Sequence, residues 1–287
     1  MVLPGRLPPG EMHPAGEADV HARFVQLDSG LRVRVVEAGP EGGDVVVLVP
    51  GWACTAWIYH ETLPALGRAG FRAMAIELKG HGLSDKPLDP AEYSLDSMRD
   101  HLIAVLDALS LPVVGLVGHS MGAAIAAHAA EKVPGRVSRI ALVAPVGFAG
   151  VPGMSLFRML TPMLCLPVLP HLASRFVVRT MLQIVYGDLR SPDERDIAEL
   201  RAPTQFPEYT RALRHLLHEF DWDSPFPNLS IPQMVIAGTK DHLSPARDAS
   251  RYSDRAVVIE EAGHVLFSEA PEIVNDVLTT FFRDSVR

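Results

Sequence analysis

The pentapeptide at 118–122, Gly-His-Ser-Met-Gly, constrains the fold of this chain more than any other feature. It follows an apolar run at 111–117 and precedes an alanine-rich segment at 123–130, so it predicts a strand, a sharp turn and a helix with Ser120 at the turn. Such a turn forces the serine into a strained, positive-φ conformation and leaves its hydroxyl accessible. Because a Gly-x-Ser-x-Gly pattern occurs by chance in about one chain in ten of this length, the rest of the sequence must support the interpretation.

A serine hydroxyl becomes a strong nucleophile when a base accepts its proton and a third group orients that base. Asp241 follows a predicted strand at 233–237, and His264 follows another at 256–260. A sharp turn between a strand and a helix that carries a nucleophile is called an elbow. The chain order Ser120, Asp241, His264 is the order expected when a serine lies at an elbow of a parallel α/β sheet. Three other aspartates lie near enough in the sequence to compete for the acid role: Asp221, Asp223 and Asp248.

On these residues the chain resembles the α/β-hydrolase fold family from about residue 23 to its C-terminus. The resemblance implies a mostly parallel central sheet flanked by helices, with a helical cap inserted above the serine. It also implies that Ser120 is the nucleophile, His264 the general base and acid, and Asp241 the orienting carboxylate. Haloalkane and epoxide hydrolases of this fold use an aspartate at the elbow, so the serine disfavours both activities.

A second resemblance concerns the oxyanion hole, where backbone amides stabilise the charge that develops during acyl transfer. The segment after the strand at 44–49, Pro-Gly-Trp-Ala-Cys-Thr, resembles the family pattern His-Gly-x-x-x-Ser. By resemblance the two donors are the amides of Trp52 and Met121. Pro50 stands where the family usually has a histidine that braces this loop, so the rigidity of the loop is open.

Hydrophobic patterning predicts the organisation of the core. A β-hairpin is expected at 24–27 and 31–36, where Arg32 and Arg34 alternate with valines as in a half-exposed edge. Continuous apolar runs predict buried parallel strands at 44–49, 71–77, 112–117 and 137–143, and helical stripes are expected at 94–109 and 271–283. These elements divide the chain into a flexible or surface-laid arm at 1–22, a core at 23–146 and 227–287, and a cap at 147–226.

The cap begins with a stretch at 153–170 that is rich in proline, leucine and methionine. Flexible methionines suit adaptable apolar surfaces, so this stretch favours an apolar pocket, of the kind that holds an acyl chain, above the elbow. The side chains expected to line the pocket are those of Trp52, Met154, Phe157, Leu160 and Val265.

These features favour a serine hydrolase that cleaves a carboxylic ester of a medium-sized apolar substrate through an acyl-enzyme, without a cofactor or metal. Three alternatives keep the same fold. One is a carbon–carbon bond hydrolase of ring-cleavage products, although Val265 replaces the tryptophan that often follows the histidine there. The sequence does not assign the cap arginine of such an enzyme, a role in which Arg175 or Arg179 could serve. Another is a thioesterase, lactonase or peracid-forming enzyme, and the last is a binding protein without activity.

Composition excludes other classes of function. The 287 residues include 26 basic and 34 acidic side chains, a formal net charge of −8, which argues against nucleic acid as a partner. No apolar stretch has the length of a membrane span, and the first ten residues contain none of signal-peptide length. Cys54 and Cys165 fit free thiols in a reducing compartment. A small-molecule partner and a cytoplasmic location are therefore expected, and the oligomeric state is open.

Overall fold

The computed structural model describes residues 5–146, 154–160, 173–246, 249, 252–253 and 255–284. In this part of the chain one eight-stranded sheet has the order β1-β2-β4-β3-β5-β6-β7-β8. β2 pairs antiparallel with β1 and β4, and all other neighbours are parallel, as predicted. The strands are β1 Val20–Gln26, β2 Arg32–Ala38, β3 Val45–Val49, β4 Arg72–Glu77, β5 Val114–His119, β6 Val137–Val143, β7 Gln233–Gly238 and β8 Ala256–Ile259.

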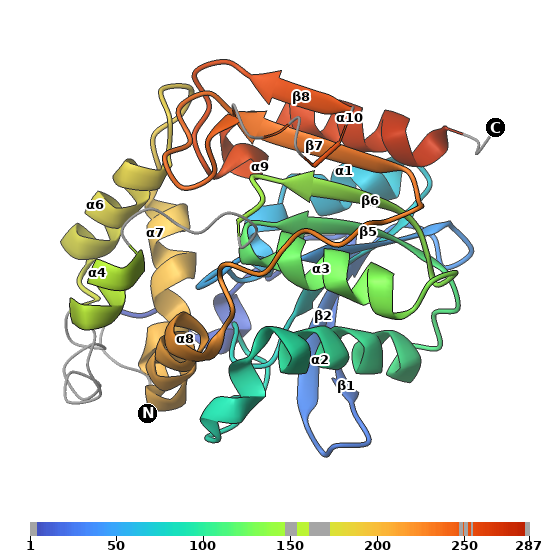
Figure 1. The fold of residues 1–287 in the computed structure, drawn as a ribbon. Coiled ribbons are helices and arrows are strands. Elements are labelled where there is room, and N and C mark those ends of the chain that lie inside the picture. Colours follow the sequence, from blue (N-terminus) through green and yellow to red (C-terminus); the bar gives the residue numbers. More distant parts are fainter. Residues whose placement is uncertain are drawn as a thin grey trace.

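Helices cover both faces of this sheet (Figure 1). α2 and α3 pack on one face, where Met98, Leu102 and Ile125 are fully buried. α1, α9 and α10 pack on the other face with Leu63 and Leu278. The bounds of these helices are α1 Thr62–Arg68, α2 Leu95–Ala108, α3 Met121–Lys132, α9 Leu266–Glu269 and α10 Pro271–Arg283, and short 3₁₀ turns occur at Pro9–Glu11, Ala56–Tyr59, Pro90–Tyr93 and Ala202–Gln205.

Local sequence explains why these helices begin where they do. The Ser94 hydroxyl accepts a hydrogen bond from the Ser97 amide at 3.2 Å, which caps α2 at the start of its apolar stripe. Pro271 occupies the first turn of α10, where a missing N–H costs nothing. The helices predicted at 94–109 and 271–283 are thus confirmed to within one residue at each end.

The prediction of a half-exposed edge was wrong for Arg34. β2 lies between β1 and β4, and the Arg34 side chain is buried. Its guanidinium donates to a carboxylate oxygen of Glu77 at 3.1 Å and to the carbonyl of His13 at 2.5 Å. A buried charge is stable only when it is paired and hydrogen-bonded, and Glu77 provides the pairing from the neighbouring strand.

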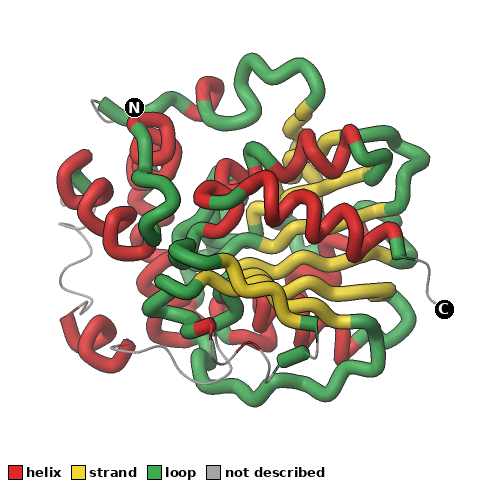
Figure 2. Tube along the Cα trace, turned by 90° about the horizontal axis from the view of Figure 1, so that it is seen from above, coloured by secondary structure: helices red, strands yellow, loops and turns green. Residues whose placement is uncertain are grey.

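Between β6 and β7 the described residues form four α-helices and the 3₁₀ turn Ala202–Gln205, here called the cap, which lie at the carboxyl ends of the parallel strands (Figure 1). Figure 2 shows the N-terminus beside these helices and the C-terminus at the opposite end of the sheet. The described part of the N-terminal arm binds the cap: Arg6 donates to the Thr204 hydroxyl, and the His13 amide to Glu199, both at 2.8 Å. β1 begins at Val20, inside the range expected for the arm. The cap helices are α4 Met154–Leu160, α6 Arg175–Val185, α7 Glu194–Arg201 and α8 Pro207–Glu219.

Buried histidines make the stability of this fold dependent on pH. Burial, with nearby Lys79 and His81 adding to it, lowers the pKa of His101 to about 3, against about 6.5 in an unfolded chain. Between these values the unfolded state binds more protons than the folded state, so the free energy of unfolding falls as the pH falls. Burial also lowers the pKa of five other histidines: His13, His81, His119, His128 and His215.

We therefore expect His101→Gln to reduce the loss of stability on acidification. The glutamine amide oxygen can replace the ring nitrogen that accepts the Lys79 amide at 3.0 Å. Urea unfolding at neutral pH and near pH 5 should show that the variant loses about 2 kcal/mol less than the wild type over this interval. His21→Gln, at an exposed position, should lose as much as the wild type. Equal losses in all three proteins would contradict the account.

Candidate active site

Ser120 forms the turn between β5 and α3 that the pentapeptide predicted. Its backbone lies at φ 54° and ψ −124°, a region that residues with a side chain rarely adopt. Close packing around the turn holds this conformation: a Cβ on Gly122 would lie 2.2 Å from the Val49 carbonyl oxygen, and one on Gly118 would lie 2.5 Å from the Ala123 Cα. Glycine at both positions therefore lets β3, β5 and α3 approach one another around the serine.

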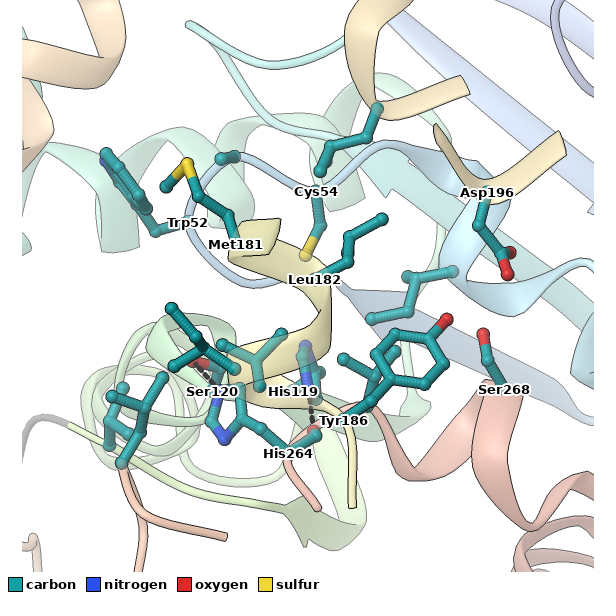
Figure 3. A pocket seen from close by; sticks show the side chains of 18 of the residues that line it. Trp52, Cys54, His119, Ser120, Met181, Leu182, Tyr186, Asp196, His264 and Ser268 are labelled. Atoms are coloured by element: carbon teal, nitrogen blue, oxygen red, sulfur yellow. Dashed lines mark hydrogen bonds between the residues drawn. The ribbon is translucent and has the colours of Figure 1, made fainter. Parts of the chain in front are cut away.

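The structure brings together Ser120, His264 and Asp241. The His264 Nε2 lies 2.9 Å from the Ser120 Oγ, and its Nδ1 lies 2.7 Å from the Asp241 Oδ2 (Figure 3 shows the first two residues). The other oxygen of Asp241 accepts the amides of Leu243 and Ser244 at 2.8 and 2.9 Å, so the carboxylate is fixed at both ends. All three side chains are buried. Of the competing acids, Asp221 and Asp223 are exposed on the loop after α8, and Asp248 lies outside the described residues.

His119, the second residue of the pentapeptide, contacts the loop that carries His264. Its Nε2 donates to the backbone carbonyl of His264 at 3.0 Å, and the two rings lie 5.1 Å apart. Burial, and then the neighbouring His264, lowers the pKa of His119 to about 3, so this ring stays neutral near pH 7. It is therefore a second contact that fixes the position of His264.

The loop after β3 lies against the serine, and α8 of the cap braces it. A Cβ on Gly51 would meet the Ser120 Cβ at 2.8 Å, so the loop touches the elbow. The Trp52 indole donates to the Leu213 carbonyl at 2.9 Å, and the Tyr209 hydroxyl to the Ala53 carbonyl at 3.0 Å. Through these two hydrogen bonds the cap braces the loop after β3. The side chain at position 50 cannot do so, because it is a proline. The Met121 amide lies at the first position of α3, where a helix leaves its amides without internal partners.

A cavity of about 510 Å³ opens over the Ser120 hydroxyl. Of the side chains expected to line a substrate pocket, those of Trp52, Met154 and Val265 line this cavity, and those of Phe157 and Leu160 lie outside the described part of the chain. The cavity also has lining residues that were not predicted, from the loop after β3, from α6 and from the segment after α8, among them Trp57, Met181, Leu182, Ile184 and Trp222. For α6 a signal existed, because most of its apolar residues share one wide side of the helix: Val177, Val178, Met181, Leu182, Ile184 and Val185.

Polar groups in the cavity gather at two ends. Ser120, His119 and His264 form one group, while Tyr186 and Ser268 lie at the other end with Asp196 (Figure 3). The Asp196 carboxylate is already bound by the Trp57 indole at 2.9 Å. The rest of the lining is mostly apolar, and no lysine or arginine of the described residues lines it.

The cap arginines considered for a carbon–carbon hydrolase point elsewhere. Arg175 and Arg179 both bind the carboxylate of Glu194 on the exposed side of the cap, and neither lines the cavity. The residues described also contain no group of three potential metal ligands and no helix long and apolar enough to cross a membrane.

Known proteins are similar to this chain in sequence and in fold. The family model described as alpha/beta hydrolase fold matches residues 44–271. The dihydrolipoyllysine-residue acetyltransferase component of the acetoin cleaving system from Pseudomonas putida is 31% identical over 88% of this chain and 67% of its own length. Epoxide hydrolase A from Mycobacterium tuberculosis is 27% identical over 88% of this chain and 94% of its own length.

Among solved structures, the epoxide hydrolase CorEH superposes with a TM-score of 0.79 at 20% identity, over 92% of this chain and 99% of that one. At this level of identity the similarity concerns the fold alone. The family model, however, spans most of the chain and includes the elbow, Asp241 and His264. The chain therefore belongs to the α/β hydrolase fold family.

Proposed function

We propose that this protein is a serine hydrolase that cleaves a carboxylic ester of a medium-sized apolar substrate. The observation that carries the proposal is the continuous row of hydrogen bonds from Ser120 through His264 to Asp241, at 2.9 and 2.7 Å, on the wall of an apolar cavity. A nucleophile, a base and an orienting acid in this arrangement are what acyl transfer through an acyl-enzyme requires.

In the first half-reaction the Ser120 Oγ attacks the ester carbonyl carbon while His264 Nε2 takes the serine proton. The carbonyl oxygen becomes negatively charged and accepts hydrogen bonds from the amides of Trp52 and Met121, each contributing about 3 kcal/mol to the barrier reduction. His264 then gives the proton to the leaving alkoxide as the C–O bond breaks. In the second half-reaction the same imidazole takes a proton from water as the water oxygen attacks the acyl carbon. The bond between that carbon and the Ser120 Oγ then breaks, His264 gives the proton to the Oγ, and the acid is released.

The cavity supports a neutral, apolar substrate. Without a lysine or arginine among its described lining residues, it has no cation to bind a carboxylate such as the one a ring-cleavage product carries. This favours an ester over a carbon–carbon bond as the target. Thioesters and lactones present the same carbonyl to the same machinery and are the nearest competing substrates.

We do not infer epoxide hydrolase activity for this chain from the relatives that carry that name. In that branch the elbow residue is an aspartate, whose carboxylate attacks the epoxide carbon directly. Here Ser120 occupies the elbow and is bound to His264 Nε2, an arrangement that removes a proton from a hydroxyl nucleophile. The acyl-transfer mechanism is therefore the one that the residues at this elbow support.

Initial rates on nitrophenyl esters from acetate to palmitate test this proposal. We expect a maximum at an intermediate acyl length, because the cavity is apolar but of finite volume. Ser120→Ala should reduce kcat by a factor of about 10⁶ while keeping the thermal midpoint of the wild type. Turnover that persists in the purified alanine variant, or negligible rates in the folded wild type on every ester, would contradict an esterase mechanism at this serine.

The bracing of the oxyanion loop by the cap gives a second test, in which Tyr209→Phe removes one brace. The lost hydrogen bond contributes about 1 kcal/mol, so we expect kcat to fall about fivefold with little change in KM. Tyr93→Phe is the matched control, because its buried hydroxyl donates to the Pro87 carbonyl at 2.7 Å, outside the cavity. Both variants should lose similar stability, but only Tyr209→Phe should lose turnover. Equal kcat values in the two variants would show that the brace does not act on the active site.

A further inference from the structure

Three consecutive amides fix the backbone of the loop that carries His264. The amides of Gly263 and Val265 donate to the two carboxylate oxygens of Glu269, at 2.9 Å to Oε2 and 3.1 Å to Oε1. The His264 amide between them donates to the Val185 carbonyl, at the end of α6, at 2.7 Å. One side chain therefore holds the loop on both sides of the histidine.

The same carboxylate also binds the cap. The Glu269 Oε2 accepts the Gly187 amide at 2.6 Å, just beyond the C-terminus of α6. The two segments are in close contact there, since a Cβ on Gly187 would lie 2.4 Å from the Gly263 nitrogen, and one on Gly263 would lie 2.3 Å from the Gly187 nitrogen. Glu269 thus joins the histidine loop and the cap through a single group.

This arrangement is unfavourable for the carboxylate itself. Glu269 is buried, at 6% exposure, and in the described chain it forms no ion pair. Burial raises its pKa, and the negative charge of Asp241 adds to the effect, while the three amide hydrogen bonds act in the opposite direction. A buried acid near another acid destabilises the fold unless its hydrogen bonds compensate, so its location calls for a role beyond packing.

We propose that Glu269 is a positioning residue for His264. It does not line the cavity and so does not touch the substrate. By binding the amides on either side of His264, it holds the imidazole in line between Asp241 and Ser120, and by binding Gly187 it ties that alignment to the seating of α6. The inference rests on the proposed function, in which His264 activates the serine.

The test measures how fast Ser120 attacks a fluorophosphonate, a reaction that does not require ester turnover. The serine Oγ forms a bond to phosphorus, the P–F bond breaks, fluoride leaves and His264 accepts the serine proton. Glu269→Gln keeps the shape of the side chain but places an NH₂ group against one of the three amides. A displacement of about 1 Å at a catalytic group can lower rates about 100-fold, so we expect the saturating labelling rate to fall about 10- to 100-fold with an unchanged half-saturation concentration.

Glu272→Gln is the matched control, because it removes the same charge from an exposed position at the start of α10. It should label like the wild type. Glu269→Asp keeps the charge on a shorter side chain and serves as the second variant if the glutamine protein does not fold. At temperatures below its thermal midpoint it should also be labelled slowly. Rates are compared per site that finally becomes labelled, so a fraction of misfolded protein does not affect them.

The outcomes separate the inference from its premise. Labelling within about twofold of the wild type, with only a lower thermal midpoint, would show that Glu269 merely stabilises the fold and would overturn the inference while leaving the proposed function standing. Failure of the wild type to be labelled at Ser120 would overturn both. Slow labelling in the Glu269 variants alone is the result we expect.

Discussion

The strained backbone of Ser120 is the constraint on which the rest of the structure depends. A residue with a side chain at φ 54° is held there only when its surroundings leave no alternative. Here the surroundings are β3, β5 and α3, which approach closely because Gly118 and Gly122 have no side chain. The strain directs the hydroxyl away from the sheet toward the ends of β7 and β8, where Asp241 and His264 complete the row of hydrogen bonds.

The cap does more than cover this site, because it binds both halves of it. α8 holds the loop after β3 through the hydrogen bonds of Trp52 and Tyr209. The end of α6 holds the loop that carries His264, through the Val185 carbonyl and the Gly187 amide. A shift of the cap would therefore disturb both the loop that we propose to carry an oxyanion donor and the loop that carries the proposed base.

Much of the core and the arrangement of the candidate triad could be predicted from the sequence, because they depend on local patterns. Buried strands and helix starts are encoded within a few residues, and the family order places the acid and the histidine after particular strands. Contacts between distant segments were not predictable. Alternating charge around Arg34 looks the same at a sheet edge and in a buried ion pair, and its partner Glu77 lies 43 residues away. The braces on Trp52 and the binding of Gly187 by Glu269 likewise depend on how the cap packs, which no single segment encodes.

The central claim is that Ser120 is the nucleophile, and mapping the covalent product of a fluorophosphonate tests it most directly. Intact-mass measurement followed by peptide sequencing would locate the added group and count it. The account predicts one phosphonyl group per chain, attached to Ser120, with ester turnover falling in proportion to labelling. Attachment at another residue, or full turnover after complete labelling, would contradict it.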